Sequence, residues 1–427
     1  MKKKNKSKIG IAALLFVPLI SISLFAGCAS AATIYVPTDY STIQEAIDAA
    51  SPGDTVFVWN GTYYDGDGVK IEKDRITLQG EDVNTTTIHG KWTADGVVYV
   101  SGKYVNVGGF TVTGSSSSGS GIYLYYGSCN CRLSRNNASN NYLGIQVNAA
   151  LAVPGLSSSD NNTLTGNSAN NNTYGIYLYS SSDNNTLTGN SANNNTYGIY
   201  LYSSSNNNLA GNSANNNYDG IRLSSSCNNN LAGNSANNNY DGIRLSSSCN
   251  NNLTGNIANN NNYGIGLRST SMKNNITENT VSNNPNDGIY LDWSGENEIW
   301  HNNFINNNKQ AHNYHGFNNW DKGPAVGGNY WSDHACHGNP SNGTEPYANI
   351  YTDTEAVDNY PFENPDGWYL AGDLNRDGKI DYEDAAIVLS LAVKGKYSTA
   401  ADVSGDGRVT SLDALMILQA GYGATTM

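Results

Sequence analysis

The sequence predicts an all-β chain whose main body is a right-handed, single-stranded parallel β-helix, followed by a small all-α module. Two observations support the first part of this prediction. Asp160–Ser182 is copied verbatim as Asp183–Ser205, and Asn206–Cys227 is copied verbatim as Asn228–Cys249. Each copy alternates apolar and polar residues with the period of two that is typical of a β-strand. Such units bury their apolar face only by stacking into a solenoid.

The repeat keeps one register over many copies. A glycine opens each G-I-x-L-like unit at steps of 22 to 24 residues, apart from one longer step that accommodates Ala149–Ser157. In each unit the isoleucine and leucine are expected to point inward and the residues between them outward. Inward positions recur at Leu164, Leu187, Leu209, Leu231, Leu253, Ile276 and Ile299, and asparagines recur at Asn136, Asn167, Asn190, Asn212, Asn234, Asn256, Asn279 and Asn302. Asparagine tolerates sharp corners, and its amide can bond to the next amide in a stack.

The segment before the repeats predicts the start of the stack. Thr33–Val36 is typical of a strand, and Ser41-Thr42-Ile43-Gln44 resembles a capping box that opens a short helix through Ala50. This helix is expected to cover the open end of the apolar core, which a solenoid requires. Less regular strands are predicted at Thr55–Val58, Ile76–Gln79, Val97–Val100 and Val105–Val112.

The N-terminus and the composition indicate export. Five lysines precede an apolar run from Ile9 to Ala26, so residues 1–31 are predicted to be a signal peptide. Phe25-Ala26-Gly27-Cys28 resembles an imperfect lipobox, so a lipid anchor at Cys28 is an alternative to simple secretion. No later segment is apolar enough to span a bilayer, and the net charge of -13 argues against a nucleic-acid partner. Five cysteines remain after cleavage, an odd number that does not indicate a disulfide framework.

Two end segments resemble a known family. The opening, Thr33–Tyr63, is similar to that of archaeal surface β-helix proteins, and Ile299–Phe362, with H-N-N-F-I-N-N and G-G-N-Y-W-S-D, is similar to the closing segment of NosD-like proteins. The resemblance implies the pectin-lyase-like fold and a link to copper handling. We therefore expect a β-helix over residues 32–308 and a closing segment over residues 309–364.

The composition changes after Pro365 to acidic loops followed by apolar helices. Asp373, Asn375, Asp377, the Lys379 carbonyl, Asp381 and Asp384 have the spacing of an oxygen-lined calcium loop, with Gly378 at its turn. A second copy consists of Asp402, Ser404, Asp406, the Arg408 carbonyl, Thr410 and Asp413. Two such loops in tandem, each closed by aspartate, resemble a type I dockerin over residues 369–424. The resemblance implies two calcium ions and a cohesin-bearing partner.

The repeats offer one pair of weak catalytic candidates. Asp219 and Asp241 share a register, as do Arg222 and Arg244, and paired carboxylates one coil apart suit a retaining glycosidase. Verbatim duplication produces such a pair from any residue, so a salt-bridged surface ladder is the simpler interpretation, and no catalytic residue is assigned.

Two further groups are candidates for ligand binding. Outward tyrosines form a ladder that can stack on sugar rings or can simply be the β-formers of an exposed sheet: Tyr123, Tyr177, Tyr200 and Tyr290, with Tyr125, Tyr179 and Tyr202 two residues on. His312, His315, His334 and His337 lie within 26 residues, together with Cys336, which suits copper or zinc but also fits a loop with scattered histidines.

Three functions are consistent with these features. The first is a secreted or surface component, structural or carbohydrate-binding, that is docked to a cohesin. The second is a polysaccharide lyase or glycoside hydrolase delivered to a complex by the dockerin. The third, copper handling, follows from the family resemblance alone.

Overall fold

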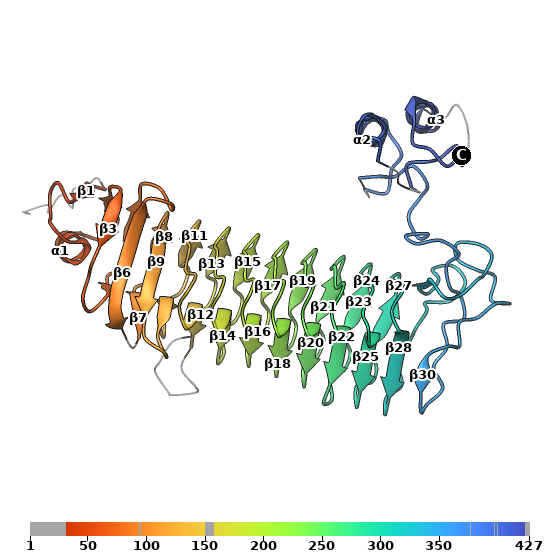
Figure 1. Cartoon of the computed structure of the whole chain (residues 1–427), viewed down its shortest axis with the longest axis horizontal. Coiled ribbons are helices and arrows are strands. Elements are labelled where there is room, and N and C mark those ends of the chain that lie inside the picture. Colours follow the sequence, from red (N-terminus) through yellow and green to blue (C-terminus); the bar gives the residue numbers. More distant parts are fainter. Residues whose placement is uncertain are drawn as a thin grey trace, which may run out of the picture. The chain divides into compact units, whose positions relative to one another are not determined.

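The computed structural model describes residues 31–93, 95–149, 158–375, 377–396, 398 and 400–422. The predicted signal peptide, including Cys28, lies outside these residues except for Ala31. Figure 1 shows short strands of successive coils lying side by side from β1 to β30, and every pairing between consecutive coils is parallel. The predicted parallel β-helix is therefore confirmed.

Two long sheets run the length of the β-helix, and in the described residues each contains 12 strands. The first sheet consists of β1 (Thr33–Val36), β2 (Thr55–Val58), β5 (Thr77–Gly80), β8 (Asn106–Gly108), β11 (Arg132–Ser134), β13 (Thr163–Thr165), β15 (Thr186–Thr188), β17 (Asn208–Ala210), β19 (Asn230–Ala232), β21 (Asn252–Thr254), β23 (Asn275–Thr277) and β26 (Glu298–Trp300). The second sheet consists of β4 (Val69–Ile71), β7 (Gly96–Val100), β10 (Ser120–Leu124), β12 (Leu143–Asn148), β14 (Tyr174–Tyr179), β16 (Tyr197–Tyr202), β18 (Asp219–Ser224), β20 (Asp241–Ser246), β22 (Tyr263–Arg268), β25 (Asp287–Asp292), β28 (Lys309–Tyr314) and β30 (Tyr351–Thr352).

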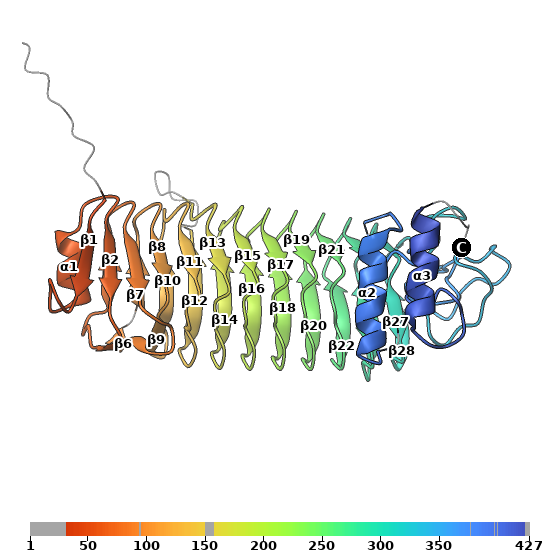
Figure 2. The same cartoon turned by 90° about the horizontal axis from the view of Figure 1, so that it is seen from above.

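A third side closes each coil. It begins as β3 (Gly61–Tyr63), β6 (Thr86–Thr93) and β9 (Thr111–Ser115), and it ends as β24 (Thr280–Ser282), β27 (Asn303–Ile305) and β29 (Tyr330–Trp331). Between them the side is reduced to single parallel bridges that step from Thr111 through Ser168 and Ser235 to Thr280. Figure 2 shows the coils from a second direction, with the same order of strands.

The core is a set of aliphatic rows. Ile176, Ile199, Ile221 and Ile243 pair in register and are fully buried, as are the leucines two residues further on. The outward side chains between them are tyrosine or arginine. The period-two alternation therefore assigned the buried and the outward residues correctly.

A ladder of buried asparagines closes one corner. The Asn190 side chain accepts the Asn167 backbone N–H at 2.9 Å and its side-chain N–H at 3.0 Å, and it donates to the Leu164 carbonyl at 2.9 Å. The same bonds recur from Asn136 to Asn302 and extend to Asn329. Because these side chains are at most 2% exposed, the ladder satisfies backbone groups that would otherwise be buried without partners.

The N-terminal end is covered by α1 (Ile43–Ala49), whose Ile43, Ala46 and Ile47 are buried. The capping box is formed by Thr42 and Glu45, one residue later than Ser41 and Gln44. Glu45 lies at the third helical position, from which its carboxylate reaches back to the backbone N–H of Thr42. The Ser41 hydroxyl also donates to this carboxylate, at 2.8 Å. The predicted cap is therefore present, with a corrected start.

The C-terminal end of the core is aromatic. Trp331 stacks on Phe304 at 4.6 Å and on Tyr347 at 4.1 Å, and all three are buried. The closing segment thus adds flat side chains to the last coil. The final module has its own small core, which contains Val388 of α2 (Tyr382–Val393) and Ile417 of α3 (Ser411–Gly421). Among the described residues no helix is both long and apolar enough to cross a bilayer.

Candidate functional site

The outer face of the second sheet, from β14 to β28, carries most of the candidate residues, and we call it the tyrosine–arginine face. Strand pairing produces three outward rows along it. The first contains Tyr174, Tyr197, Asp219, Asp241, Tyr263, Asp287 and Lys309, and the second contains Tyr177, Tyr200, Arg222, Arg244, Gly266, Tyr290 and His312. The third contains Tyr179, Tyr202, Ser224, Ser246, Arg268, Asp292 and Tyr314. Residues from seven coils therefore lie on one surface.

Tyrosines stack closely over the first two of these coils. The ring centroids of Tyr177 and Tyr200 are 5.2 Å apart with planes at 18°, and those of Tyr179 and Tyr202 are 5.4 Å apart at 17°. Tyr174 and Tyr197 form a third pair at 4.9 Å. The in-register pairing of the coils produces this stacking because like residues fall on like. Burial raises the pKa of the Tyr177 hydroxyl.

The aromatic surface continues beyond the predicted residues. Tyr218 and Tyr240, at the edge of the next two coils, stack at 4.8 Å with planes at 2°. Tyr263 follows at 5.8 Å from Tyr240, and Tyr290 follows at 5.5 Å from Tyr263. Tyr290 was predicted on this face from the sequence, whereas Tyr218, Tyr240 and Tyr263 were missed, although Tyr263 occupies an outward position that the register predicts.

The aspartates and arginines form buried ion pairs. Arg222 Nη1 lies 3.1 Å from Asp219 Oδ2, Arg244 Nη1 lies 3.3 Å from Asp241 Oδ2, and each carboxylate side chain is fully buried. Arg268 Nη2 adds a contact of 3.1 Å to Asp241 Oδ1. The predicted pairing is present, but the ladder is not a surface ladder, because the arginines and the neighbouring rings cover the carboxylates.

Burial determines the titration of this pair. It raises the pKa of Asp219, and the negative charge of Asp241 raises it further. Burial also raises the pKa of Asp241, against the lowering effect of Arg268 and Arg244. Raised carboxyl pKa values are a property of catalytic acids. Here, however, the carboxylates are covered, so substrate cannot contact them in this structure.

The four histidines are not brought together as one metal-binding group. His312 is buried at 3.5 Å from Asp287, whereas His315 lies between Asp292 and Asp353. His334 and His337 contact the Glu345 carbonyl and carboxylate, respectively. In the part of the chain that the structure describes, no cluster of three or more His, Cys, Asp or Glu residues is placed to hold a metal ion. Cys336 is a free, buried thiol.

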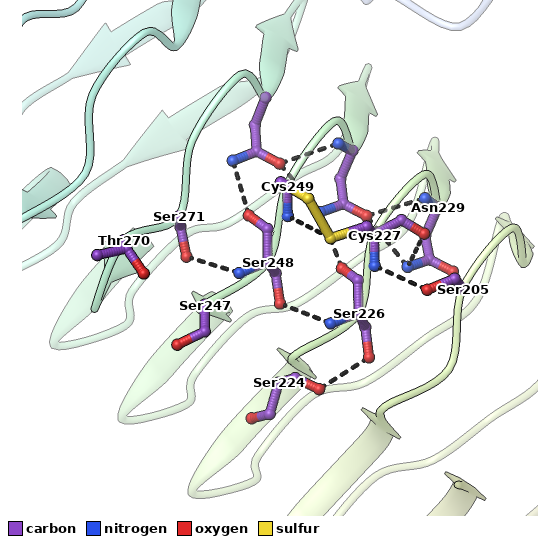
Figure 3. Close-up of a disulfide and its surroundings, with 12 residues drawn as sticks. Ser205, Ser224, Ser226, Cys227, Asn229, Ser247, Ser248, Cys249, Thr270 and Ser271 are labelled. Atoms are coloured by element: carbon purple, nitrogen blue, oxygen red, sulfur yellow. Dashed lines mark hydrogen bonds between the residues drawn. A yellow bond between two sulfur atoms is a disulfide. The ribbon is translucent and has the colours of Figure 1, made fainter. Parts of the chain in front are cut away.

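One disulfide links two coils of the tyrosine–arginine face. Cys227 and Cys249, whose Cα atoms are 4.6 Å apart, are bonded between the turns that follow β18 and β20 (Figure 3). Beside them the Ser226 backbone N–H donates to the Ser248 hydroxyl at 3.1 Å. The odd cysteine count gave no indication of this bond, but the register could have predicted it, because coil stacking places the two Cα atoms within disulfide range. The bond ties together the coils that carry Arg222 and Arg244.

The two acidic loops of the C-terminal module have matching geometry. Asp373 accepts the backbone N–H groups of Asp377 and Gly378, and Asp402 accepts those of Asp406 and Gly407. Gly378 and Gly407 have φ values of 81° and 78°, the left-handed conformation that a calcium loop needs at its sixth position. Each loop leads directly into a helix.

The last aspartate of each loop also lies at the third position of the following helix, where it completes a capping box with the N-cap residue. Asp384 accepts the N–H groups of Leu374 and Asp381, and Asp413 accepts those of Ser404 and Thr410. The remaining predicted ligands lie around the same loops: Asn375, Lys379, Asp381 and Arg408. The oxygen donors, turn glycines and helix starts are those of a calcium loop, but the carboxylates among the described residues accept backbone N–H groups and are not gathered around one point.

Comparison with protein families identifies both parts of the chain. The model described as periplasmic copper-binding protein (NosD) matches residues 38–213 and 156–336. The chain belongs to the NosD family. The model described as dockerin type I domain matches residues 371–420, so the second predicted resemblance is confirmed as well. Type I dockerins bind calcium and imply a cohesin-bearing partner.

Solved structures share the fold of this NosD-family chain. The A-module of mannuronan C-5 epimerase AlgE6 from Azotobacter vinelandii superposes with a TM-score of 0.51 at 17% identity, covering 65% of this chain and 90% of that one. A protein of Geobacillus virus E2, ORF18, superposes with a TM-score of 0.53 at 16% identity, covering 63% and 58%, respectively. At this identity the likeness concerns the fold alone. No curated protein matches the sequence.

Proposed function

We propose that this chain is a secreted or surface-attached polysaccharide-binding protein that a calcium-loaded dockerin anchors to a cohesin-bearing partner. The observation that carries the proposal is the tyrosine–arginine face, where stacked tyrosines from neighbouring coils present a continuous aromatic surface. Flat aromatic side chains with a polar tip suit the apolar faces and hydroxyl groups of sugar rings. The likeness to the dockerin family supports an address outside the cell.

The dockerin supplies the anchoring part of this proposal. Leu412 and Leu415 of α3 are 51% and 50% exposed, and Val393 of α2 is 88% exposed. Exposed aliphatic side chains on so small a module are typical of a protein-binding surface. We propose that two calcium ions, one in each loop, hold the helices in the arrangement that presents these residues.

Glycan binding can be tested with paired variants in the full chain. Tyr177→Ala with Tyr200→Ala removes two stacked rings from the face, whereas Tyr64→Ala removes an equally large ring that is 76% exposed in a loop elsewhere. In affinity electrophoresis through gels that contain polysaccharide, the unaltered protein and the Tyr64 variant should be retarded, and the double variant should run freely. Equal migration of all three proteins in every gel would refute the proposal.

Catalysis is a second candidate because Asp219 and Asp241 form a carboxyl pair with raised pKa values. Two observations oppose it: both carboxylates are covered, and identical coils give them similar surroundings, whereas an acid and a base need different ones. We expect no new reducing ends or unsaturated products from any polysaccharide. If the protein did cleave a polysaccharide and the Asp219→Asn variant did not, catalysis and not binding would be its function. Copper binding, which the description of the family model names, is not supported by a group of three or more gathered His, Cys, Asp or Glu ligands in the described residues.

A further inference from the structure

Three arginines lie in consecutive coils near the middle of the tyrosine–arginine face. Arg222 belongs to β18, Arg244 to β20 and Arg268 to β22, and each side chain is 21% exposed. The chain has eight arginines, so three of them share this surface. The protein as a whole carries a net charge of -13, which makes the concentration of guanidinium groups at one place unusual for it.

Tyrosine rings hold two of these guanidinium groups. Arg222 lies 5.3 Å and 5.0 Å from the ring centroids of Tyr197 and Tyr200, and Arg268 lies 5.2 Å and 5.3 Å from those of Tyr263 and Tyr290. Such cation–π contacts fix the plane of a guanidinium without using its N–H groups. The arginines are thus flanked on both sides by the aromatic surface that we propose binds sugar rings.

Arg268 reaches across the position of Gly266. A Cβ atom at Gly266 would lie 3.8 Å from Arg268 Nε, an ordinary van der Waals contact, so the guanidinium lies over this strand close to the position of Gly266. From there it reaches one coil back to Asp241 at 3.1 Å.

The group has spare hydrogen-bonding capacity. Its three guanidinium groups face the buried carboxylates Asp219 and Asp241, and Asp287 and Asp292 lie on the next coil beside Arg268, so the group is distinguished by its N–H donors and not by a net charge. Each guanidinium has five N–H donors, yet Arg222 and Arg244 each make two protein hydrogen bonds, and the buried Arg268 Nε has no acceptor among the described residues. Buried polar atoms normally have partners, so an acceptor is expected here.

From these contacts we infer that Arg222, Arg244 and Arg268 bind the acidic groups, carboxylate or sulfate, of a charged polysaccharide. The inference rests on the proposed glycan binding and specifies its substrate class. Sugar rings stack on the tyrosines of β14 and β16 on one side and on Tyr263 and Tyr290 on the other, while acidic groups accept N–H donors from the arginines between them. A planar guanidinium donates two parallel bonds to a carboxylate or sulfate, which gives selectivity for that group over a hydroxyl.

The fixed geometry of the arginines supports a binding site rather than a simple surface ion pair. The disulfide between Cys227 and Cys249 ties the coils of Arg222 and Arg244, and their carboxylate partners are fully buried. Arginines held in this way lose little freedom when a ligand binds, which improves affinity. A nucleic acid fits less well, because three arginines that already pair with aspartates, in a protein of net charge -13, cannot neutralise a continuous phosphate backbone.

The test compares polysaccharides that differ only in charge. Polygalacturonate and its fully methyl-esterified form share one backbone, and dextran sulfate and dextran supply the corresponding pair for sulfate. Isothermal titration with the full chain should give at least about tenfold tighter binding to one charged polymer than to its neutral counterpart. A preference within the polygalacturonate pair would identify carboxylate as the acidic group, and a preference within the dextran pair would identify sulfate. Added salt should weaken binding to the charged polymer only.

Variants locate the preference on the face. Arg222→Lys with Arg244→Lys keeps the charge that Asp219 and Asp241 need but loses the planar fork, so the preference should drop by about tenfold while the thermal midpoint is kept. Arg132→Gln, an exposed arginine on the first sheet, should change neither. Equal binding of charged and neutral polymers by the unaltered protein, or a preference that survives the double variant, would overturn the inference and leave glycan binding intact. Binding of none of the four polymers would count against both.

Discussion

The asparagine ladder gives a quantitative test of what holds the coils together. Asn212 is 1% exposed, and it accepts the Asn190 backbone N–H at 2.9 Å and the Asn190 side-chain N–H at 3.0 Å. It also donates to the Leu187 carbonyl at 2.9 Å and to Asn234 at 3.0 Å. Asn212→Ala therefore leaves two buried N–H groups of Asn190 and the Leu187 carbonyl without this partner.

Each buried group that loses its partner costs roughly 1–3 kcal/mol, so three groups should cost about 3 to 9 kcal/mol of local stability, less if water enters the space. Hydrogen exchange followed by mass spectrometry is the appropriate assay, because a repeat protein need not unfold as one unit. Peptides spanning β15 to β19 should exchange faster by a factor that corresponds to this free energy, while peptides from β4 to β7 stay unchanged.

The control is Asn208→Ala, which removes a half-buried side chain that accepts a single bond, from Asn230 at 2.8 Å. It should cost about 1 kcal/mol or less. If Asn212→Ala left exchange in the adjacent coils unchanged, or if the control had the same effect, the ladder would not be the stabilising element that the structure indicates.

Three further predictions concern other parts of the chain. In calorimetry, Asp373→Ala should reduce calcium affinity more than Asp402→Ala, because the first loop has four aspartates among its ligands and the second has three; equal losses would contradict this ranking. Alkylation of the denatured, unreduced chain should leave Cys227 and Cys249 unlabelled, and replacing both by serine should cost about 3 kcal/mol; labelling of both without reductant would disprove the bond. Burial raises the pKa of Asp358 to about 7, so the stability that its proton provides is complete below about pH 4, the value in the unfolded chain, and is lost as the pH rises through about 7. Tryptophan fluorescence should therefore report a lower thermal midpoint at pH 8 than at pH 5, and Asp358→Asn should reduce that difference; an unaltered difference would rule out Asp358 as its source.

Much of the fold could be predicted because the repeats align chemically similar residues. Ile176 and its counterparts alternate with polar residues, and this period of two predicts β-strands. Because the repeats bury their apolar faces only by stacking on one another, these strands form a β-helix. The capping box was placed one residue early because Ser41 and Thr42 are both good N-caps, and only the position of Glu45 decides between them.

The site was harder to predict, because it depends on contacts between coils. Sequence reasoning identified Arg222 and Arg244 but not Arg268, which follows a glycine that breaks the apparent pattern of the row. It also interpreted Asp219 and Asp241 as a salt-bridged surface ladder, because verbatim duplication stacks any residue on its copy, whereas both carboxylates are fully buried. A side chain's burial depends on its neighbours in the adjacent coils, and the pattern of a single repeat does not contain that information.

The most direct test of the account is a crystal structure of the calcium-loaded chain with a hexasaccharide cut from the charged polymer that it binds best. We expect sugar rings on the tyrosines between β14 and β25, and an acidic group within hydrogen-bonding distance of Arg222, Arg244 or Arg268. A hexasaccharide bound to another side of the β-helix, with the tyrosine–arginine face left bare, would contradict the central claim that this face is the polysaccharide-binding site.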